Sequence, residues 1–296
     1  MSSNFINNLQ SNLKNLSKVQ NQLSSLKEVS KSSDDPMLVS EIMDLNDSII
    51  QNKEYMNTIE DSIDFSNMQD TAYDAATKSM SRIRTLIQQA GTDTVNNEDR
   101  QLIKAEVEAE IQTLTDALNT NFGGKYVFSG MNTTEKPFHV EKDANGNFVD
   151  LTYSGTSDNL SRRISQGVQI ELKTNGAALL NDQGAEGDLG TFLSNVVTAL
   201  KENNVEALSG ELLDRTDKEI GNIVTQRAEN GAVFNRLEAS KERNISENLN
   251  LESMRSDKED IDLAEKFMEY TMEQTAYQAS LAMGTKILST SILDYL

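Results

Sequence analysis

One long stretch of this chain lacks any helix-breaking residue, and it constrains the fold more than any other feature. Between Pro36 and Gly91 there is neither proline nor glycine, and the 296 residues contain only 2 prolines and 15 glycines in all. A single helix over residues 37–90 would be about 80 Å long. Apolar side chains recur there at steps of three and four, as on a helix face. They form two successive runs, the first of Met56, Ile59 and Ile63 and the second of Ala72, Ala76, Met80, Ile83, Ile87 and Ala90. The chain is therefore expected to be built on long helices.

The N-terminal segment carries a second helical repeat. Its apolar residues follow the steps of three, four and seven that are typical of a coiled-coil seam; they are Ile6, Leu9, Leu13, Leu16, Leu23 and Leu26. The positions between them are mostly Asn, Gln, Ser and Lys, and because Asn and Ser are mediocre helix formers, the segment should be only marginally helical alone. It is expected to need a partner helix.

The C-terminal forty residues carry two apolar stripes instead of one. The first consists of Ala264, Met268, Met272, Ala276, Ala279, Met283 and Ile287, and the second of Phe267, Tyr270, Tyr277, Leu281, Leu288, Ile292 and Tyr295. One partner helix cannot cover both stripes, so this helix is expected to pack against several neighbours. Residues 1–33 carry four lysines against one glutamate, whereas residues 257–296 carry eight acids against three lysines. Ends of opposite charge are expected to pair with each other.

Between the helical segments the apolar period changes to that of strands. Short alternating runs and an Asn-Gly turn predict a small β-rich insert at roughly residues 125–180. The expected fold is mainly α, with paired terminal helices, a long-helix core and an outer β domain. The corresponding segments are 1–36 (N-terminal coiled coil), 37–124 and 189–250 (the two halves of the core), 125–188 (β-rich outer domain) and 251–296 (C-terminal coiled coil).

Composition narrows the possible functions. The net charge of −20 disfavours nucleic acid and anionic membranes as partners. With no cysteine and a single histidine, His139, thiol chemistry and multi-histidine metal sites are excluded, and no catalytic residue, metal or cofactor is predicted. No apolar run is long enough to span a bilayer, and residues 1–12 have no signal-peptide core. These features indicate a cytosolic protein, unless it is exported without a cleaved signal.

Asp34 and Asp35, which precede Pro36, are the most conspicuous pair of acids. Adjacent carboxylates can bind metal or transfer protons, but no histidine lies near and the next acid is Glu41. Aspartate caps helix N-termini and proline suits the first turn. We therefore interpret these three residues as the start of a core helix and as a candidate hinge between the terminal segment and the core.

Four sequence stretches resemble the flagellin-related axial proteins of bacterial flagella: SSDDP at Ser32–Pro36, the segment Glu98–Gly130 with GKYVFSG at its end, RAENGAVFNRLE at Arg227–Glu238, and SLAMGTKILSTSILDYL at the C-terminus. The first and third patterns are shared with flagellin. GKYVFSG followed by PF, the ending SILDYL and the small insert favour the branch of the family that joins hook and filament. The alternatives are a filament flagellin or, less favoured, a cytosolic coiled-coil scaffold.

The resemblance implies a structural subunit of the extracellular flagellum, exported through the flagellar type III apparatus without a cleaved signal, on which flagellin assembles. Its implied partners are further copies in a ring, hook-associated protein 1 on the hook side, flagellin on the filament side and an export chaperone at the C-terminal helix. The implied subunit-interface and coiled-coil residues are Ile6, Leu9, Leu13, Leu16, Leu23, Phe267, Met272, Leu281, Leu288, Ile292 and Leu296.

The weak helix propensity of the N-terminal segment gives a first prediction. In the free monomer, both terminal segments should be marginally ordered, and they should become firmly helical only on assembly. Limited proteolysis of the monomer checks this, since the first cuts should fall within residues 1–33 and 260–296. Terminal segments as resistant as the rest of the chain would contradict the prediction.

Overall fold

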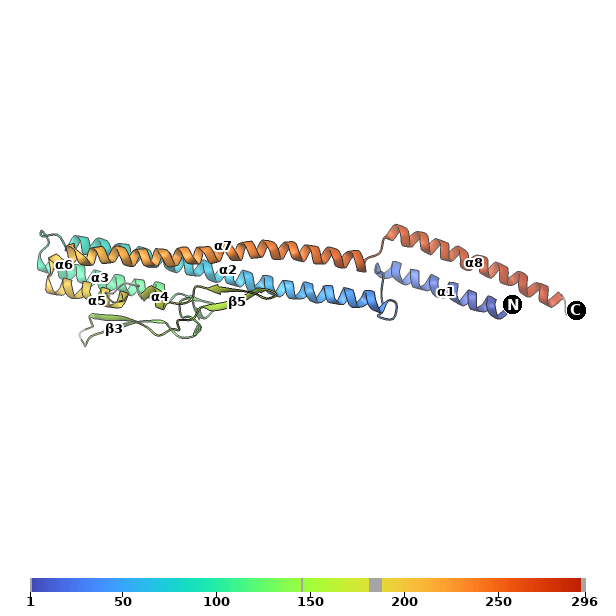
Figure 1. Ribbon diagram of the computed structural model, residues 1–296, viewed down its shortest axis with the longest axis horizontal. Helices are drawn as coiled ribbons and strands as arrows, with labels where there is room; N and C mark the ends of the chain where they lie inside the picture. Colours follow the sequence, from blue (N-terminus) through green and yellow to red (C-terminus); the bar gives the residue numbers. More distant parts are fainter. Residues whose placement is uncertain (1, 145, 181–187, 294–296) are drawn as a thin grey trace. The chain divides into compact units, whose positions relative to one another are not determined.

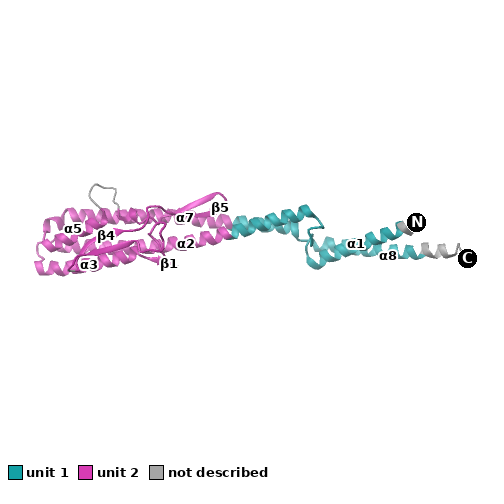
Figure 2. Cartoon of the chain, turned by 90° about the horizontal axis from the view of Figure 1, so that it is seen from below, with its two compact units in different colours: residues 1–53, 245–296 teal, residues 54–244 magenta. Residues whose placement is uncertain are grey.

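The computed structural model describes residues 2–144, 146–180 and 188–293. The chain divides into two compact units (Figure 2). Met1–Lys53 and Ile245–Leu296 form unit 1, and Glu54–Asn244 form unit 2. Unit 1 thus combines the two ends of the chain, while unit 2 contains its middle. The finer division into five functional segments stays a prediction.

The described residues are mostly helical (Figure 1). The helices are α1 (Ser2–Ser25), α2 (Pro36–Ala90), α3 (Asn97–Leu118), α4 (Ala177–Leu180), α5 (Leu189–Glu202), α6 (Val205–Ser209), α7 (Glu211–Glu259) and α8 (Leu263–Leu293). The strands are β1 (Asn121–Phe122), β2 (Lys125–Tyr126), β3 (Phe138–Lys142), β4 (Phe148–Tyr153), β5 (Leu160–Ser165) and β6 (Val168–Leu172). The predicted mainly α fold with a small β insert is confirmed, and so is the uninterrupted helix over residues 37–90.

The β insert consists of three separate antiparallel hairpins, each with two strands. Phe138 lies opposite Tyr153 in the second hairpin, and Leu160 lies opposite Leu172 in the third. None of them is wide enough to bury a face on its own, so each hairpin depends on the helices for its core. Gln69 of α2 provides one anchor, because its buried amide donates to the carbonyl of Val127 at 3.0 Å.

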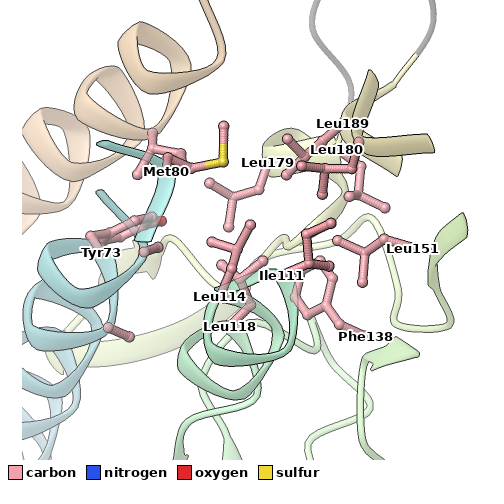
Figure 3. Close-up of a cluster of buried hydrophobic side chains, with 14 of the residues drawn as sticks. Tyr73, Met80, Ile111, Leu114, Leu118, Phe138, Leu151, Leu179, Leu180 and Leu189 are labelled. Carbon is pink, nitrogen blue, oxygen red and sulfur yellow. The ribbon is translucent and has the colours of Figure 1, made fainter. Parts of the chain in front are cut away.

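The core of unit 2 lies where α2, α3 and α5 meet the hairpins (Figure 3). The predicted stripe of α2 points into it from Ile59 onward; Met80, Ile83 and Ile87 of α2 are completely buried, as are Val107 and Leu114 of α3. The GKYVFSG segment enters the same core through Val127 and Phe128. Gly130, which ends the motif, has φ +68°, and a Cβ there would lie 2.2 Å from Thr156 Oγ1. Only glycine fits this position.

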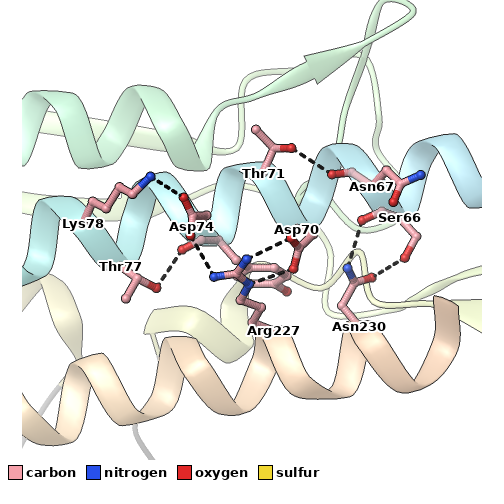
Figure 4. Close-up of polar contacts among 10 residues, drawn as sticks. Ser66, Asn67, Asp70, Thr71, Asp74, Thr77, Lys78, Arg227 and Asn230 are labelled. Atoms are coloured by element: carbon pink, nitrogen blue, oxygen red, sulfur yellow. Dashed lines mark hydrogen bonds and ion pairs between the residues drawn. The ribbon is translucent and has the colours of Figure 1, made fainter. Parts of the chain in front are cut away.

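Polar contacts fix α7 against α2 within unit 2 (Figure 4). The guanidinium of Arg227 binds both carboxylate oxygens of Asp70, at 2.7 and 2.9 Å, and also reaches Asp74 at 2.9 Å. These bonds raise the pKa of Arg227. One turn later, the buried Asn230 exchanges hydrogen bonds of 2.9 Å with the hydroxyl and carbonyl of Ser66. The motif that begins at Arg227 is therefore a docking surface for α2.

A buried arginine, Arg100, forms hydrogen bonds at the C-terminal end of α2 in unit 2. Arg100 of α3 is only 4% exposed, and it donates to the carbonyls of Ala90 and Thr92, both at 2.9 Å, and to Asn203 Oδ1. The last carbonyls of a helix carry partial negative charge and lack partners within the helix. A cation at this point satisfies them and joins the ends of α2 and α5.

Replacing this arginine should destabilise unit 2 strongly. Arg100→Met leaves buried acceptors without donors, and we expect a loss of about 3 kcal/mol in the free energy of unfolding, measured by urea denaturation. Arg82→Met removes an exposed pair with Glu106 and is the matched control, with an expected loss below about 1 kcal/mol. Equal losses for the two variants would contradict the role assigned to Arg100.

Candidate assembly interface

The two ends of the chain pair with each other in unit 1. α1 and α8 run antiparallel along a seam that the exposure of their side chains defines. On α1 the less exposed residues are Phe5, Leu9, Asn12, Leu16, Val19, Gln22 and Leu23; on α8, as far as Thr285, they are Lys266, Tyr270, Glu273, Tyr277, Ser280 and Gly284. Apart from Gln22, the steps alternate between three and four, as in a coiled coil. The seam of α8 is therefore mostly polar.

Two contacts set the register at the far end of this pair. The ring of Phe5 packs over Gly284, where a Cβ would lie only 2.4 Å from Phe5 Cζ. The amide of Asn12 donates to the Ser280 hydroxyl at 2.9 Å. The contact of Phe5 with Gly284 and the hydrogen bond between Asn12 and Ser280 can form together in only one alignment of the two helices. They therefore fix the register of the pair.

The linkers that follow α1 and α7 meet at the other end of the pair. Glu28 N donates to the carbonyl of Glu259 at 2.8 Å, and Ile261 N donates to the carbonyl of Leu26 at 3.3 Å. Leu26 adopts φ +60°, a left-handed conformation that costs a leucine about 1–2 kcal/mol. The left-handed turn brings the first linker alongside the second.

Ion pairs surround these backbone bonds. Lys27 pairs with Glu259, and Lys266 lies 3.1 Å from Glu28 and 3.2 Å from Glu269. Burial lowers the pKa of Lys266, but the hydrogen bonds to the two glutamates outweigh it, so that the pKa is raised overall. The joint between the two linkers is thus held by backbone hydrogen bonds and ion pairs.

The residues predicted to form interfaces divide into three groups. Leu9, Leu16 and Leu23 lie in the seam. Ile6, Leu13, Phe267, Met272 and Leu281 are exposed, with Met272 reaching 72%. Leu288 and Ile292 belong to α8, although their side chains are outside the described residues, as is Leu296 altogether. The spacing of apolar residues predicted that Ile6 and Leu13 would lie in the seam. Their places are taken by Phe5, Asn12 and Val19.

The Asp-Asp-Pro segment starts α2. Asp35 Oδ1 accepts the backbone N–H groups of Met37 and Leu38, both at 3.1 Å, and Pro36 is the first residue of the helix. Asp34 Oδ2 accepts the N–H of Lys31 at 3.1 Å and closes the preceding turn. Both carboxylates therefore serve the backbone, while a hinge at this point stays a prediction. Nowhere in the described residues do three or more His, Asp or Glu side chains form a group that could hold a metal ion.

Helices from both chain ends that pair with each other, together with a long-helix core and a small β insert, define an axial subunit of the flagellin type. Family profiles agree: the bacterial flagellin N-terminal helical region matches residues 1–133, and the C-terminal helical region matches residues 213–296. The chain belongs to the flagellin family of flagellar axial proteins. Among the helices that the structure describes, none has the length and hydrophobicity needed to cross a membrane.

Within the family, individual relatives match to different extents. The flagellar hook-associated protein 3 of Escherichia coli is 24% identical over 281 residues, which cover 88% of this chain and 86% of that protein. The flagellin of Bacillus subtilis is 25% identical over 210 residues, or 69% of this chain and 66% of the relative. The structure of a flagellar hook-associated protein from Vibrio parahaemolyticus superposes with a TM-score of 0.67 at 18% identity, covering 77% of this chain and all of that one.

The contact between Phe5 and Gly284 gives a prediction for the terminal pair. Gly284→Ala should push the Phe5 ring out of the seam at a cost of about 1–3 kcal/mol, so amide hydrogen exchange in α1 should accelerate about tenfold or more. The matched control is Gly221→Ala in α7, where a Cβ meets nothing within 4 Å; it should leave exchange in α1 unchanged. Unaltered exchange in Gly284→Ala would show that this contact does not hold the pair.

Proposed function

We propose that this protein is a structural subunit of the bacterial flagellum that forms the junction between hook and filament and provides the surface on which flagellin assembles. The observation that carries the proposal is the outward apolar surface of the α1–α8 pair. Because the α8 seam consists of Lys, Tyr, Glu, Ser and Gly, the large apolar side chains of α8 remain exposed; they include Phe267, Met268, Met272, Leu281 and Met283. Exposed apolar surface of this kind marks an interaction site.

The same surface suits the partners that such a subunit would have. Copies of the chain arranged in a ring would cover it from the side, with hook-associated protein 1 on the hook side and flagellin on the filament side. Before export, a cytosolic chaperone at α8 would shield it from aggregation. Export without a cleaved signal would then deliver the chain to the extracellular flagellum. The role requires no catalysis and no cofactor.

A junction role is favoured over that of a filament flagellin by the extent of similarity. The relatives named hook-associated protein 3 match 88% of the chain, against 69% for the Bacillus flagellin. Flagellin remains the second candidate, because its two helical regions match both ends of the chain. The two functions differ in what is lost with the gene.

Deleting the gene separates these candidates. For a junction subunit, the deletion strain should keep its hooks, lack filaments and release flagellin into the medium; electron microscopy and immunoblotting provide the measurements. Loss of a sole flagellin would leave no flagellin to release, and a full set of filaments would contradict both functions.

Complementation then tests the surface. Met272→Glu should restore about tenfold fewer filaments than the wild-type gene, because it places a charge on the surface that assembly would bury. Met131→Glu, at an exposed methionine of the β insert (61%, against 72% for Met272), is the matched control and should complement fully. Full complementation by both variants would contradict a role for α8 in assembly.

A further inference from the structure

An open groove of about 830 Å³ follows the outer face of α1 and the linker after it. We call it the lysine groove, after Lys14, Lys18 and Lys31, which line it together with Leu13. None of these three lysines has an ion-pair partner among the described residues, and Asp34 is the one acid in the lining. Leu13 is half exposed on this face. The groove therefore presents unpaired positive charge beside an apolar side chain.

α8 presents a surface of the opposite character, the methionine face, which comprises Met268, Met272, Ala276, Ala279 and Met283. The three methionines are 61–72% exposed. Two threonines and the two alanines surround a shallow hollow beside Met272, where small side chains permit the close approach of another helix. Glu265 and Glu269 border the face; Glu265 makes no ion pair within the described part of the chain, and Glu269 pairs only with Lys266.

The heptad positions place these two surfaces on different faces of the helix pair. When the seam residues take positions a and d, Leu13 falls at e, Lys14 at f and Lys18 at c, whereas Met272 falls at c and Ala276 at g. Positions f and c lie on the side of a helix that points away from its partner, so the lysine groove opens on the outer face of α1. The methionine face lies along the g flank of α8, and the two surfaces therefore do not meet within one chain.

Neither surface is suited to meet a copy of itself. Two lysine grooves in contact would set lysine against lysine, and two methionine faces would set glutamate against glutamate, which costs free energy. A groove from one copy and a face from another combine opposite charges around an apolar contact. Charge and shape thus favour a contact between different surfaces.

We propose that copies of this protein join head to tail, with the lysine groove of one copy receiving the methionine face of the next. Leu13 enters the hollow beside Met272, and Lys14 and Lys18 meet Glu265 and Glu269. Heterologous contacts of this kind build rings or helical arrays, whereas isologous ones stop at dimers. The inference rests on the proposed function as an axial subunit and specifies how its copies are joined.

Two charge-reversed variants test the pairing in the deletion strain. The first, Lys14→Glu with Lys18→Glu, makes the groove acidic; the second, Glu265→Lys with Glu269→Lys, makes the face basic. All four positions are exposed, so folding should be unaffected. Each variant alone should give about tenfold fewer filaments, because groove and face then repel. Co-expression of both should restore filaments, since every contact between the two kinds of copy pairs opposite charges.

Each other outcome overturns the proposal. Filaments from the acidic-groove variant alone would show that the groove is not used, and filaments from the basic-face variant alone would exclude the face. Failure of co-expression to restore filaments would show that the two surfaces do not meet. Lys125→Glu with Lys136→Glu in the β insert is the control for total charge and should complement, and the amount of each variant in the medium controls for export.

Disulfide cross-linking tests whether residue 13 of one copy lies beside residue 272 of the next. Because the chain has no cysteine, Leu13→Cys with Met272→Cys in one chain supplies the only thiols, and oxidation of isolated flagella should give a ladder of cross-linked oligomers. Dimers alone, or no cross-link, would overturn the proposal. Normal filaments in the deletion strain would contradict the proposed function itself. If the deletion strain lacks filaments but the cross-link and the charge swap both fail, the proposed function stands and only the head-to-tail contact is contradicted.

Discussion

The narrow seam between α1 and α8 determines which side chains of the terminal helices are left exposed. Packing Phe5 onto Gly284 and Asn12 onto Ser280 uses small and polar residues of α8 for the contact within the chain. The large apolar residues of the same helix are consequently displaced to its flanks. A seam built from Met272 and Leu281 would bury more apolar area, but it would leave no surface for a neighbour. The contact within the chain is modest, and the large apolar residues of α8 stay exposed.

The joint between the two linkers lies next to this seam. Backbone bonds between the two linkers and the ion pairs of Lys27 and Lys266 hold α1 and α8 without a large apolar core. Exposed ion pairs contribute little individually, so their combined effect is to orient the pair. Unit 2 differs, because its stability rests on buried apolar residues and on satisfied polar groups such as Arg100 and Asn230. Unit 2 and the terminal pair are thus held by different kinds of contact.

The features that depend on periodicity could be predicted from the sequence. The helix α2, its start at Asp35–Pro36 and the location of the β insert follow from spacing and from breaker residues. Leu9, Leu16 and Leu23 of the seam repeat every seven residues and are visible in the sequence, whereas the contact of Phe5 with a glycine and the hydrogen bond of Asn12 leave no apolar period to detect. The separation of the insert into three hairpins and the contacts of Arg100 depend on residues far apart in the chain, which local pattern cannot reveal.

In the proposed role, the outward face of the terminal helix pair holds the subunit in the flagellar axis. Cryo-electron microscopy of isolated hook–filament junctions, at a resolution that shows side chains, would reveal this contact. Met272 and Leu13 should be buried against neighbouring subunits while the contact between Phe5 and Gly284 is preserved within each copy. A ring in which Met272 faces open solvent, with subunits joined only through residues 54–244, would contradict this role.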